Sequence, residues 1–553
     1  MYKFLTDNNN YIDYQFVETK MFQQIELNND IEPLKLKLFP NDIFNYEKDN
    51  IVIIHSAIRN NEYIPGILDL SISHDKEKDK FLYLCKPDDK RIPYFLISYK
   101  IPYNFDKSIK KIYITFKYKH WDNKYPQGTM TQNFGNISVL NNFYEYILYC
   151  KSLNVSIQKF TKETINKLKN SSNKEIINSI IDKYDIKTIK KNDEFIFTLD
   201  SKISNDHDDA MSYNFTENKI SIYITNVALI LDYLNLWSSF TNRISTIYLP
   251  DKKRSMLPTI LIDGLCSLKE KQNKLCYVLN IYYDDNNNII NESISVCNAY
   301  ISKNYSHEDK CTYSINKYYK RIKSILKVGN SKDVVTKLML HFNHYMANLL
   351  SETTKGIYRS SYNKGVDVSD IPNHLPNDIY NHICMIKTHA SNYSLYDSIV
   401  DKNELYLQIT SPIRRLVDVL NNIALLDYLK IYNISNSAKD FYNHWTQKEQ
   451  IEYINISSRT IRKIQSKCKI YNQYEINKNL NKEIKYTGYV FDKLIKSDGK
   501  YQYMVYLPEL QLTTYITILY ELNNYGIYTF SLYIFMNEEN EKKKIKLQLD
   551  YIK

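Results

Sequence analysis

The chain is poor in glycine, proline and arginine. Its 553 residues include only 10 glycines and 13 prolines, and only ten of its 73 cationic residues are arginine. It also lacks any run of about 18 apolar residues, so we expect no transmembrane helix and no membrane partner. The first residues, Met1 to Asp7, turn polar at once, which is not typical of a signal peptide.

Cysteine is scarce and scattered. No two of the eight cysteines form a C-x-x-C pair, which argues against a zinc site and against a disulfide scaffold. Unpaired cysteines are typical of proteins in a reducing compartment. We therefore expect an intracellular, cytoplasmic protein, although this pattern does not exclude a nuclear location.

What the chain has in excess is tyrosine and lysine. The 52 tyrosines and the net charge of +11 would suit an anionic partner such as nucleic acid. However, lysine, asparagine, isoleucine and tyrosine all have A+T-rich codons, so the bias also indicates an A+T-rich genome, such as that of a large virus or a parasite. Composition is therefore weak evidence for function, although a hydrophobic content of 43% is enough for several cores.

The patterning along the chain predicts an α+β protein with small β-barrels at both ends. Short apolar runs separated by polar turns are typical of barrel strands, whereas apolar residues at helical spacing predict helices. We expect two barrels over residues 1–60 and 61–137, a helical connector over 138–190, a mixed block of strands and helices over 191–480, and a third barrel over 483–553.

An acidic cluster follows a predicted strand, Phe195 to Leu199. Its four carboxylates are Asp200, Asp206, Asp208 and Asp209. Four carboxylates cannot lie together in ionised form without a counter-charge. Oxygen ligands alone suit Mg²⁺ or Mn²⁺, and two such ions support phosphodiester hydrolysis. A solvated acidic loop or a calcium loop is the alternative, although the spacing does not match an EF-hand.

A pair of arginines follows the segment Thr410-Ser411-Pro412-Ile413. A hydroxyl residue followed by proline predicts a helix start here. An apolar stripe from Ile413 to Ala424 would then leave Arg414, Arg415 and Asp418 on the opposite face, where a phosphate could bind. The alternative is a surface ion pair between the arginines and Asp418.

Together these motifs resemble those of the ribonuclease II, ribonuclease R and exosome catalytic subunit family, which is defined by the RNB domain. Asp200 to Ala210 resembles its T-[IL]-D-x₅-D-x-D-D-A signature, and Thr410 to Arg415 matches its T-S-P-I-R-R. Between them, Tyr248-Leu249-Pro250 with Met256-Leu257-Pro258, and Leu265 to Leu268, resemble the family's Y-L-P…M-L-P and L-C-S-L. Cys85 to Pro93 and Trp121 to Gly128 resemble its second cold-shock barrel.

The resemblance implies an RNB catalytic domain flanked by barrels of the OB-fold and cold-shock type. Residues 1–60 would form a truncated first cold-shock-like barrel, 61–137 the second, and 483–553 a C-terminal OB-fold RNA-binding domain. The implied activity is hydrolytic 3′→5′ exoribonucleolysis of single-stranded RNA to nucleoside 5′-monophosphates.

The resemblance also implies roles for single residues. Asp200, Asp206, Asp208 and Asp209 would hold two Mg²⁺ ions, for which Mn²⁺ could substitute, and Asp208 or Asp209 would be critical for chemistry. Arg414 would contact the scissile phosphate with Arg415 nearby, and Tyr248 would stack on the 3′-terminal nucleotide.

Some positions depart from the family pattern, among them Gln408, Leu416, Asn421 and Asn422. No departure removes one of the four aspartates, so we expect an active enzyme and, in solution, a monomer. The rivals are a catalytically weak or silent RNA-binding protein on the same scaffold, and an exonuclease that acts on DNA.

Overall fold

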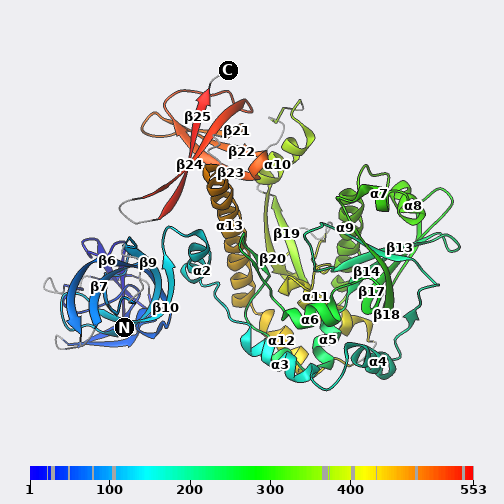
Figure 1. Cartoon of the computed structure of the whole chain (residues 1–553), viewed down its shortest axis with the longest axis horizontal. Helices are drawn as coiled ribbons and strands as arrows, with labels where there is room; N and C mark the ends of the chain where they lie inside the picture. Colours follow the sequence, from blue (N-terminus) through cyan, green and yellow to red (C-terminus); the bar gives the residue numbers. More distant parts are fainter. Residues whose placement is uncertain are drawn as a thin grey trace. The chain divides into compact units, whose positions relative to one another are not determined.

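The structure of the chain is a computed structural model, which describes residues 1–21, 23–25, 32–47, 50–77, 80–102, 108–363, 371–372, 374–399, 405–430, 433–479, 484–537 and 542–551. The chain forms two compact units (Figure 1). The first contains residues 1–154, 249–251 and 464–553, and the second contains 155–248 and 252–463. The protein is α+β, as the sequence predicted.

The N-terminal part of the first unit is a five-stranded sheet in the order β3-β2-β1-β4-β5. Its strands run from Tyr2–Thr6 (β1), Tyr14–Glu18 (β2), Gln24–Ile25 (β3), Ile43–Glu47 (β4) and Asn50–His55 (β5). Phe4, Phe16 and Phe44 are buried together in its core. Alternation of apolar and polar residues buries one face of each strand, which is why these short segments form a sheet.

A closed barrel follows, in the order β10-β8-β7-β6-β9. Its strands are Ile64–Glu77 (β6), Lys80–Pro87 (β7), Phe95–Tyr99 (β8), Lys111–His120 (β9) and Gln127–Asn136 (β10). Gly128 lies where β10 pairs with β9 on one side and with β8 on the other, and a Cβ there would come within 2.8 Å of Phe116 and Ile97. Trp121 is buried in the barrel core. Gly128 is therefore one of the few glycines of the chain, and it lies where the closed barrel leaves no room for a side chain.

The C-terminal part of the first unit is a five-stranded sheet in the order β23-β22-β21-β24-β25. Its strands are Lys485–Ile495 (β21), Tyr501–Leu507 (β22), Leu512–Ile518 (β23), Ile527–Met536 (β24) and Lys543–Tyr551 (β25). The long helix α13, Lys448–Asn479, precedes it, and Ile470 of that helix packs into the core of the sheet.

The region predicted as a helical connector contains three helices: Leu140–Cys150 (α2), Gln158–Leu168 (α3) and Asn173–Tyr184 (α4). Helix α2 belongs to the first unit, whereas α3 and α4 belong to the second. Helix α4 begins with a capping box, in which the Ser172 side chain accepts from Glu175 N and Glu175 accepts from Ser172 N.

The second unit is built on a six-stranded sheet in the order β11-β18-β12-β13-β14-β17. The strands are Thr188–Ile189 (β11), Ile196–Asp200 (β12), Asp209–Asn214 (β13), Lys219–Thr225 (β14), Gln272–Tyr283 (β17) and Ile289–Ser306 (β18). Helices around it include Val227–Tyr233 (α5), Lys317–Leu326 (α8), Ser331–Ser351 (α9) and Leu416–Leu429 (α11). Among the described residues, no helix is long and apolar enough to cross a membrane.

Two predictions about the arginine segment were wrong. Helix α11 begins at Leu416 and not near Ser411, so Pro412 and both arginines lie in a turn before the helix. Asp418 is fully buried and not on a surface, as are the neighbouring residues on every side of the first turns of α11. The reason is that α11 packs on several elements at once, so a stripe pattern does not describe its faces.

Candidate nuclease site

The acidic cluster lies at one end of two neighbouring strands of the second unit. Asp200 is the last residue of β12 and Asp209 is the first residue of β13, which pair in antiparallel fashion. The loop 201–208 joins them and carries the other two carboxylates. Because the two strands pair, the beginning and the end of the motif are brought back to the same edge of the sheet.

The L-C-S-L segment holds this loop in place. His207 N donates to Ser267 Oγ at 3.0 Å, and Ser267 Oγ donates to the carbonyl of Asn205 at 3.3 Å. Leu268 N donates to the carbonyl of His207 at 2.9 Å. The L-C-S-L segment, about 60 residues away in sequence, thus supports the acidic loop.

Three of the four carboxylates have partners within the protein. Asp200 Oδ2 lies 2.6 Å from His207 Nδ1. Both carboxylate oxygens of Asp206 accept from Lys253 Nζ, at 2.7 and 2.8 Å. Asp208, whose side chain is 2% exposed, accepts from Ile413 N at 2.9 Å and lies 3.3 Å from Arg414 Nε. The hydrogen bond from Ile413 N to Asp208 joins the acidic motif to the arginine motif across 205 residues of sequence.

The electrostatics indicate an excess of negative charge around Asp208 and Asp209. Burial raises the pKa of Asp208 to about 7, although Arg414 and Ile413 N–H oppose the shift. Burial, followed by the negative charges of Asp200 and Asp208, raises the pKa of Asp209 well above its usual value. A cation placed here would lower both pKa values and take up the charge.

The donor chemistry fits a hard divalent cation, because every candidate ligand is a carboxylate oxygen. In the part of the chain that the structure describes, no three His, Cys, Asp or Glu side chains converge as a ready-made metal site. Asp200, Asp206 and Asp208 are turned instead toward His207, Lys253 and Arg414. Metal binding would therefore exchange these partners for the ion.

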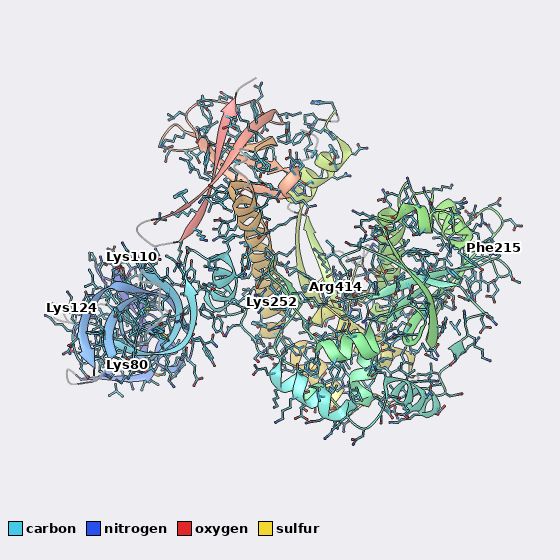
Figure 2. The ribbon with its side chains drawn as sticks, in the orientation of Figure 1. Lys80, Lys110, Lys124, Phe215, Lys252 and Arg414 are labelled. Carbon is cyan, nitrogen blue, oxygen red and sulfur yellow. The ribbon has the colours of Figure 1, made fainter. Side chains whose placement is uncertain are left out.

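The two adjacent arginines point to different places. Arg414, marked in Figure 2, has a side chain that is 47% exposed and lies beside Asp208, and its Nη2 donates to Ser411 Oγ at 3.0 Å. Arg415 Nη2 donates instead to the buried Asp418 at 2.8 Å, and the same Oδ1 atom accepts from Ser411 N at 2.7 Å. Arg414 therefore serves the acidic site, and Arg415 holds the turn.

Tyr248 lies on the same side as Arg414. It ends the short strand β15, Ile247–Tyr248, which pairs with Lys253–Arg254 (β16). Tyr248 is 45% exposed, and the positive charge of Arg414 opposes the rise in its pKa that burial causes. Electrostatic effects on one another link six of the seven predicted site residues: Asp200, Asp206, Asp208, Asp209, Arg414 and Tyr248. The charge of Arg415 also acts on Asp208, but its side chain hydrogen-bonds to Asp418.

The departures from the family pattern have structural partners. The Asn421 side chain accepts from Ile357 N and donates to the carbonyls of Ile357 and Gln408. Asn422 donates to the carbonyl of Asp418. Leu416 is fully buried, and Gln408 hydrogen-bonds to Tyr393. Within the described part of the chain, none of these side chains hydrogen-bonds to the acidic loop 201–208, so the departures leave the carboxylates unchanged.

Sequence reasoning missed Lys253 and the role of His207. Lys253 lies between the Y-L-P and M-L-P motifs, and the pairing of β15 with β16 directs it to Asp206. In the sequence, only its position between these two motifs indicated that Lys253 could belong to the site. His207 Nδ1 lies 2.6 Å from Asp200 Oδ2, a contact that the sequence pattern does not predict.

The Arg415–Asp418 pair yields a stability prediction. Asp418→Ala would leave a mostly buried guanidinium and Ser411 N without their acceptor, and removing one member of a buried pair costs about 3–5 kcal/mol. We expect a lower melting temperature in differential scanning calorimetry. Asp427→Ala is the matched control on the same helix: it removes a partly exposed partner of Lys355 and should change the melting temperature little. Equal melting temperatures for the two variants would contradict this account.

Two segments match known domain families. Residues 189–314 match the RNB domain, and residues 82–151 match the Dis3-like cold-shock domain 2. In sequence, the chain is 30% identical to ribonuclease R of Chlamydia pneumoniae over 122 residues, which cover 21% of this chain and 17% of that relative. The first three curated relatives are covered over only 17% to 38% of their length.

Two solved structures share the fold. Mycoplasma genitalium RNase R in complex with ribose-methylated single-stranded RNA superposes with a TM-score of 0.67 at 14% identity, covering 98% of this chain and 96% of that one. Yeast Ssd1, described as a pseudonuclease, superposes with a TM-score of 0.55 at 14% identity, covering 85% of this chain and 67% of that one. At such identities the likeness concerns the fold alone.

Proposed function

We propose that this chain, which carries the RNB domain of the ribonuclease II and ribonuclease R family, is an exoribonuclease. It would hydrolyse single-stranded RNA from the 3′ end and release nucleoside 5′-monophosphates. The observation that carries the proposal is the contact of Asp208 with Ile413 N and Arg414, which joins the acidic cluster to the arginine motif. A carboxylate cluster beside an exposed guanidinium is suited to phosphodiester chemistry.

Asp200, Asp206, Asp208 and Asp209 would hold two Mg²⁺ ions, with Mn²⁺ as a possible substitute. When bound, the ions would supply an activated water and stabilise the leaving oxygen. Lys253 Nζ and His207 Nδ1, which contact Asp206 and Asp200, would release these carboxylates as the ions enter. Because metal and protons compete for the carboxylates, metal affinity should fall as the pH drops below the pKa of Asp208, about 7.

Arg414 would bind the scissile phosphate through its half-exposed guanidinium, which Asp208 and Ser411 orient. Tyr248, exposed next to it, would stack on the 3′-terminal base, and stacking tolerates any sequence. Arg415 would act by holding the turn that carries Arg414. The barrels would bind RNA through its backbone, and we propose a cytoplasmic monomer.

The alternative is an RNA-binding protein without activity on the same scaffold. Two observations favour it: the likeness to a pseudonuclease, and the pairing of the carboxylates with side chains of the protein. Against it stand the four aspartates and Arg414, because a protein that only binds RNA has no use for a cluster that repels phosphate.

One assay separates these functions. Single-stranded RNA and DNA of the same sequence, labelled at the 5′ end, are incubated with the protein in Mg²⁺, in Mn²⁺ and in excess chelator. We expect a ladder of RNA shortened from the 3′ end with either metal, none with chelator, and nucleoside 5′-monophosphate as the product by chromatography. RNA bound but intact in both metals would favour the silent protein, and an equal ladder on DNA would point to a nuclease without sugar preference.

A further inference from the structure

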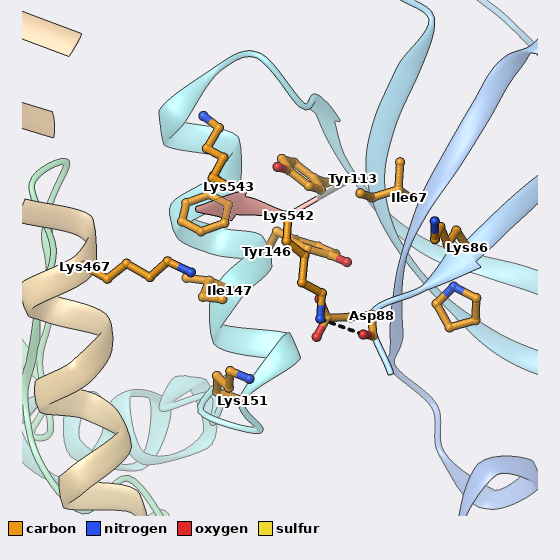
Figure 3. Close-up of a pocket in the computed structure, with 12 residues that line it drawn as sticks. Ile67, Lys86, Asp88, Tyr113, Tyr146, Ile147, Lys151, Lys467, Lys542 and Lys543 are labelled. Carbon is orange, nitrogen blue, oxygen red and sulfur yellow. Dashed lines mark hydrogen bonds and ion pairs between the residues drawn. The ribbon is translucent and has the colours of Figure 1, made fainter. Parts of the chain in front are cut away.

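A pocket outside the nuclease site is lined by five lysines. It lies within the first unit, where the barrel β6–β10, helix α2, helix α13 and strand β25 meet (Figure 3). Its lysines are Lys86, Lys151, Lys467, Lys542 and Lys543. Asp88 is the one acidic residue in the lining. The pocket therefore holds an excess of four positive charges at neutral pH.

Of the five lysines, Lys86, Lys467 and Lys543 are partly buried, whereas Lys151 and Lys542 are exposed. Asp88 forms an ion pair with Lys542. Lys542 Nζ lies 3.0 Å from Asp88 Oδ1 and also donates to the Asp88 carbonyl at 2.8 Å. Burial and the charges of neighbouring lysines lower the pKa of Lys467, and burial with Lys478 does so for Lys543. Folding therefore places lysines where their charged form is less stable than in water. Such a cost is offset when an anion occupies the site.

Aromatic rings form the other wall. Tyr113 and Tyr146 stack with ring centroids 4.3 Å apart, and Phe143 lies against Tyr471. Lys543 Nζ lies 5.7 Å from the Phe143 ring centroid and Lys467 Nζ lies 5.4 Å from that of Tyr471. These contacts fix the long side chains, so that they are pre-organised around the pocket and lose little entropy on binding.

The pocket is small. The space open to the centres of water molecules is about 80 Å³. This space suits a compact ligand better than one that carries a sugar and a base. Its size and charge together favour a compact oxyanion with several negative charges.

We propose that this pocket is a binding site for a compact polyphosphate anion of the size of pyrophosphate. Lys467 of α13 and Lys542 and Lys543 at β25 would bind it from one side, and Lys86 and Lys151 from the barrel and the end of α2. Since these elements come from residues 64–154 and 464–553, the bound anion would join the two halves of the first unit and stabilise it. The proposal does not rest on the exoribonuclease activity.

The test measures binding of sodium pyrophosphate to the full chain by isothermal titration calorimetry, in excess chelator so that the acidic site stays without metal. We expect saturable one-to-one binding and a melting temperature that rises with pyrophosphate concentration. Lys467→Gln with Lys543→Gln should weaken binding by about a hundredfold, since each contact from a charged donor is worth about tenfold. Lys469→Gln, an exposed lysine on the same helix, should bind within about twofold of the parent chain.

A second arm separates a free anion from a phosphate of the RNA backbone. A short single-stranded RNA is titrated under the same conditions, with and without saturating pyrophosphate. RNA binding that depends on Lys467 and Lys543, without any pyrophosphate binding, would overturn the proposal and assign the pocket to RNA. Pyrophosphate binding that both lysine variants share equally would also overturn it. Because the double variant removes unfavourable charge, its melting temperature without ligand should not fall, which verifies that it folds.

Discussion

Asparagine in place of Asp209 is expected to lower the rate of RNA degradation by about three orders of magnitude. Asp209 begins β13 at the edge where Asp200 and Asp208 meet, and burial together with the charges of both neighbours raises its pKa. The substitution removes one negative charge and one ligand oxygen while it keeps the shape of the side chain. Metal affinity and chemistry should therefore suffer, whereas the fold should not. The rate is measured in a single turnover with labelled RNA.

The control for this variant is Asp193→Asn. Asp193 is an exposed aspartate a few residues before β12, where it accepts from Lys190 N. This variant should degrade RNA at the rate of the parent chain, and Asp209→Asn should still bind RNA and melt no lower than the parent. If Asp209→Asn degraded RNA as fast as the parent chain does, the acidic cluster would have no part in the mechanism.

Lysine in place of Arg414 should lower the rate by about a hundredfold with a smaller effect on RNA binding. The guanidinium of Arg414 reaches Asp208 through Nε and Ser411 through Nη2, and an ammonium group cannot make both contacts in that geometry. The phosphate would therefore meet a charge that is less well oriented. The measurement is the rate at saturating RNA, compared with the RNA concentration that gives half of it.

Two further arginines make this result specific. Arg321→Lys alters a residue that donates to Tyr213 Oη, near the other end of β13, and should keep the rate within about twofold. Arg415→Lys should lower the melting temperature, because it weakens the contact with buried Asp418. If Arg414→Lys and Arg415→Lys had the same effects on rate and melting temperature, the division of roles between the two arginines would be wrong.

Much of the candidate site could be predicted from sequence because it lies in motifs of fixed spacing. The strand Phe195–Leu199 before the acidic cluster was predicted, and β12 spans Ile196–Asp200. The resemblance to the ribonuclease II and ribonuclease R family is confirmed by the matches over residues 189–314 and 82–151. The proposed domain boundaries, the two metal ions and the residue roles stay predictions.

The errors have one physical origin. The helix predicted to start at Ser411 begins at Leu416, because the segment before it bonds to distant parts of the chain. Thr246 N donates to the carbonyl of Arg414, Leu416 N donates to the carbonyl of Ile244, and the Arg414 side chain pairs with Asp208; these partners lie 160 or more residues away. A rule for helix starts that uses only neighbouring residues cannot take such distant partners into account. For the same reason the sequence pattern placed Asp418 on the surface, whereas the structure buries it.

By itself, the sequence identified the four aspartates and the rare arginine pair as the candidate site, because their spacing stands out whatever the composition of the chain. It also determined the α+β class and the short strands at both ends, because apolar periodicity is a local property. Only the tertiary structure decided which carboxylate meets which cation, which of two adjacent arginines faces Asp208, and that five lysines enclose one pocket. Those pairings join residues that lie far apart in the chain, and their energies depend on burial, which exists only once the chain has folded.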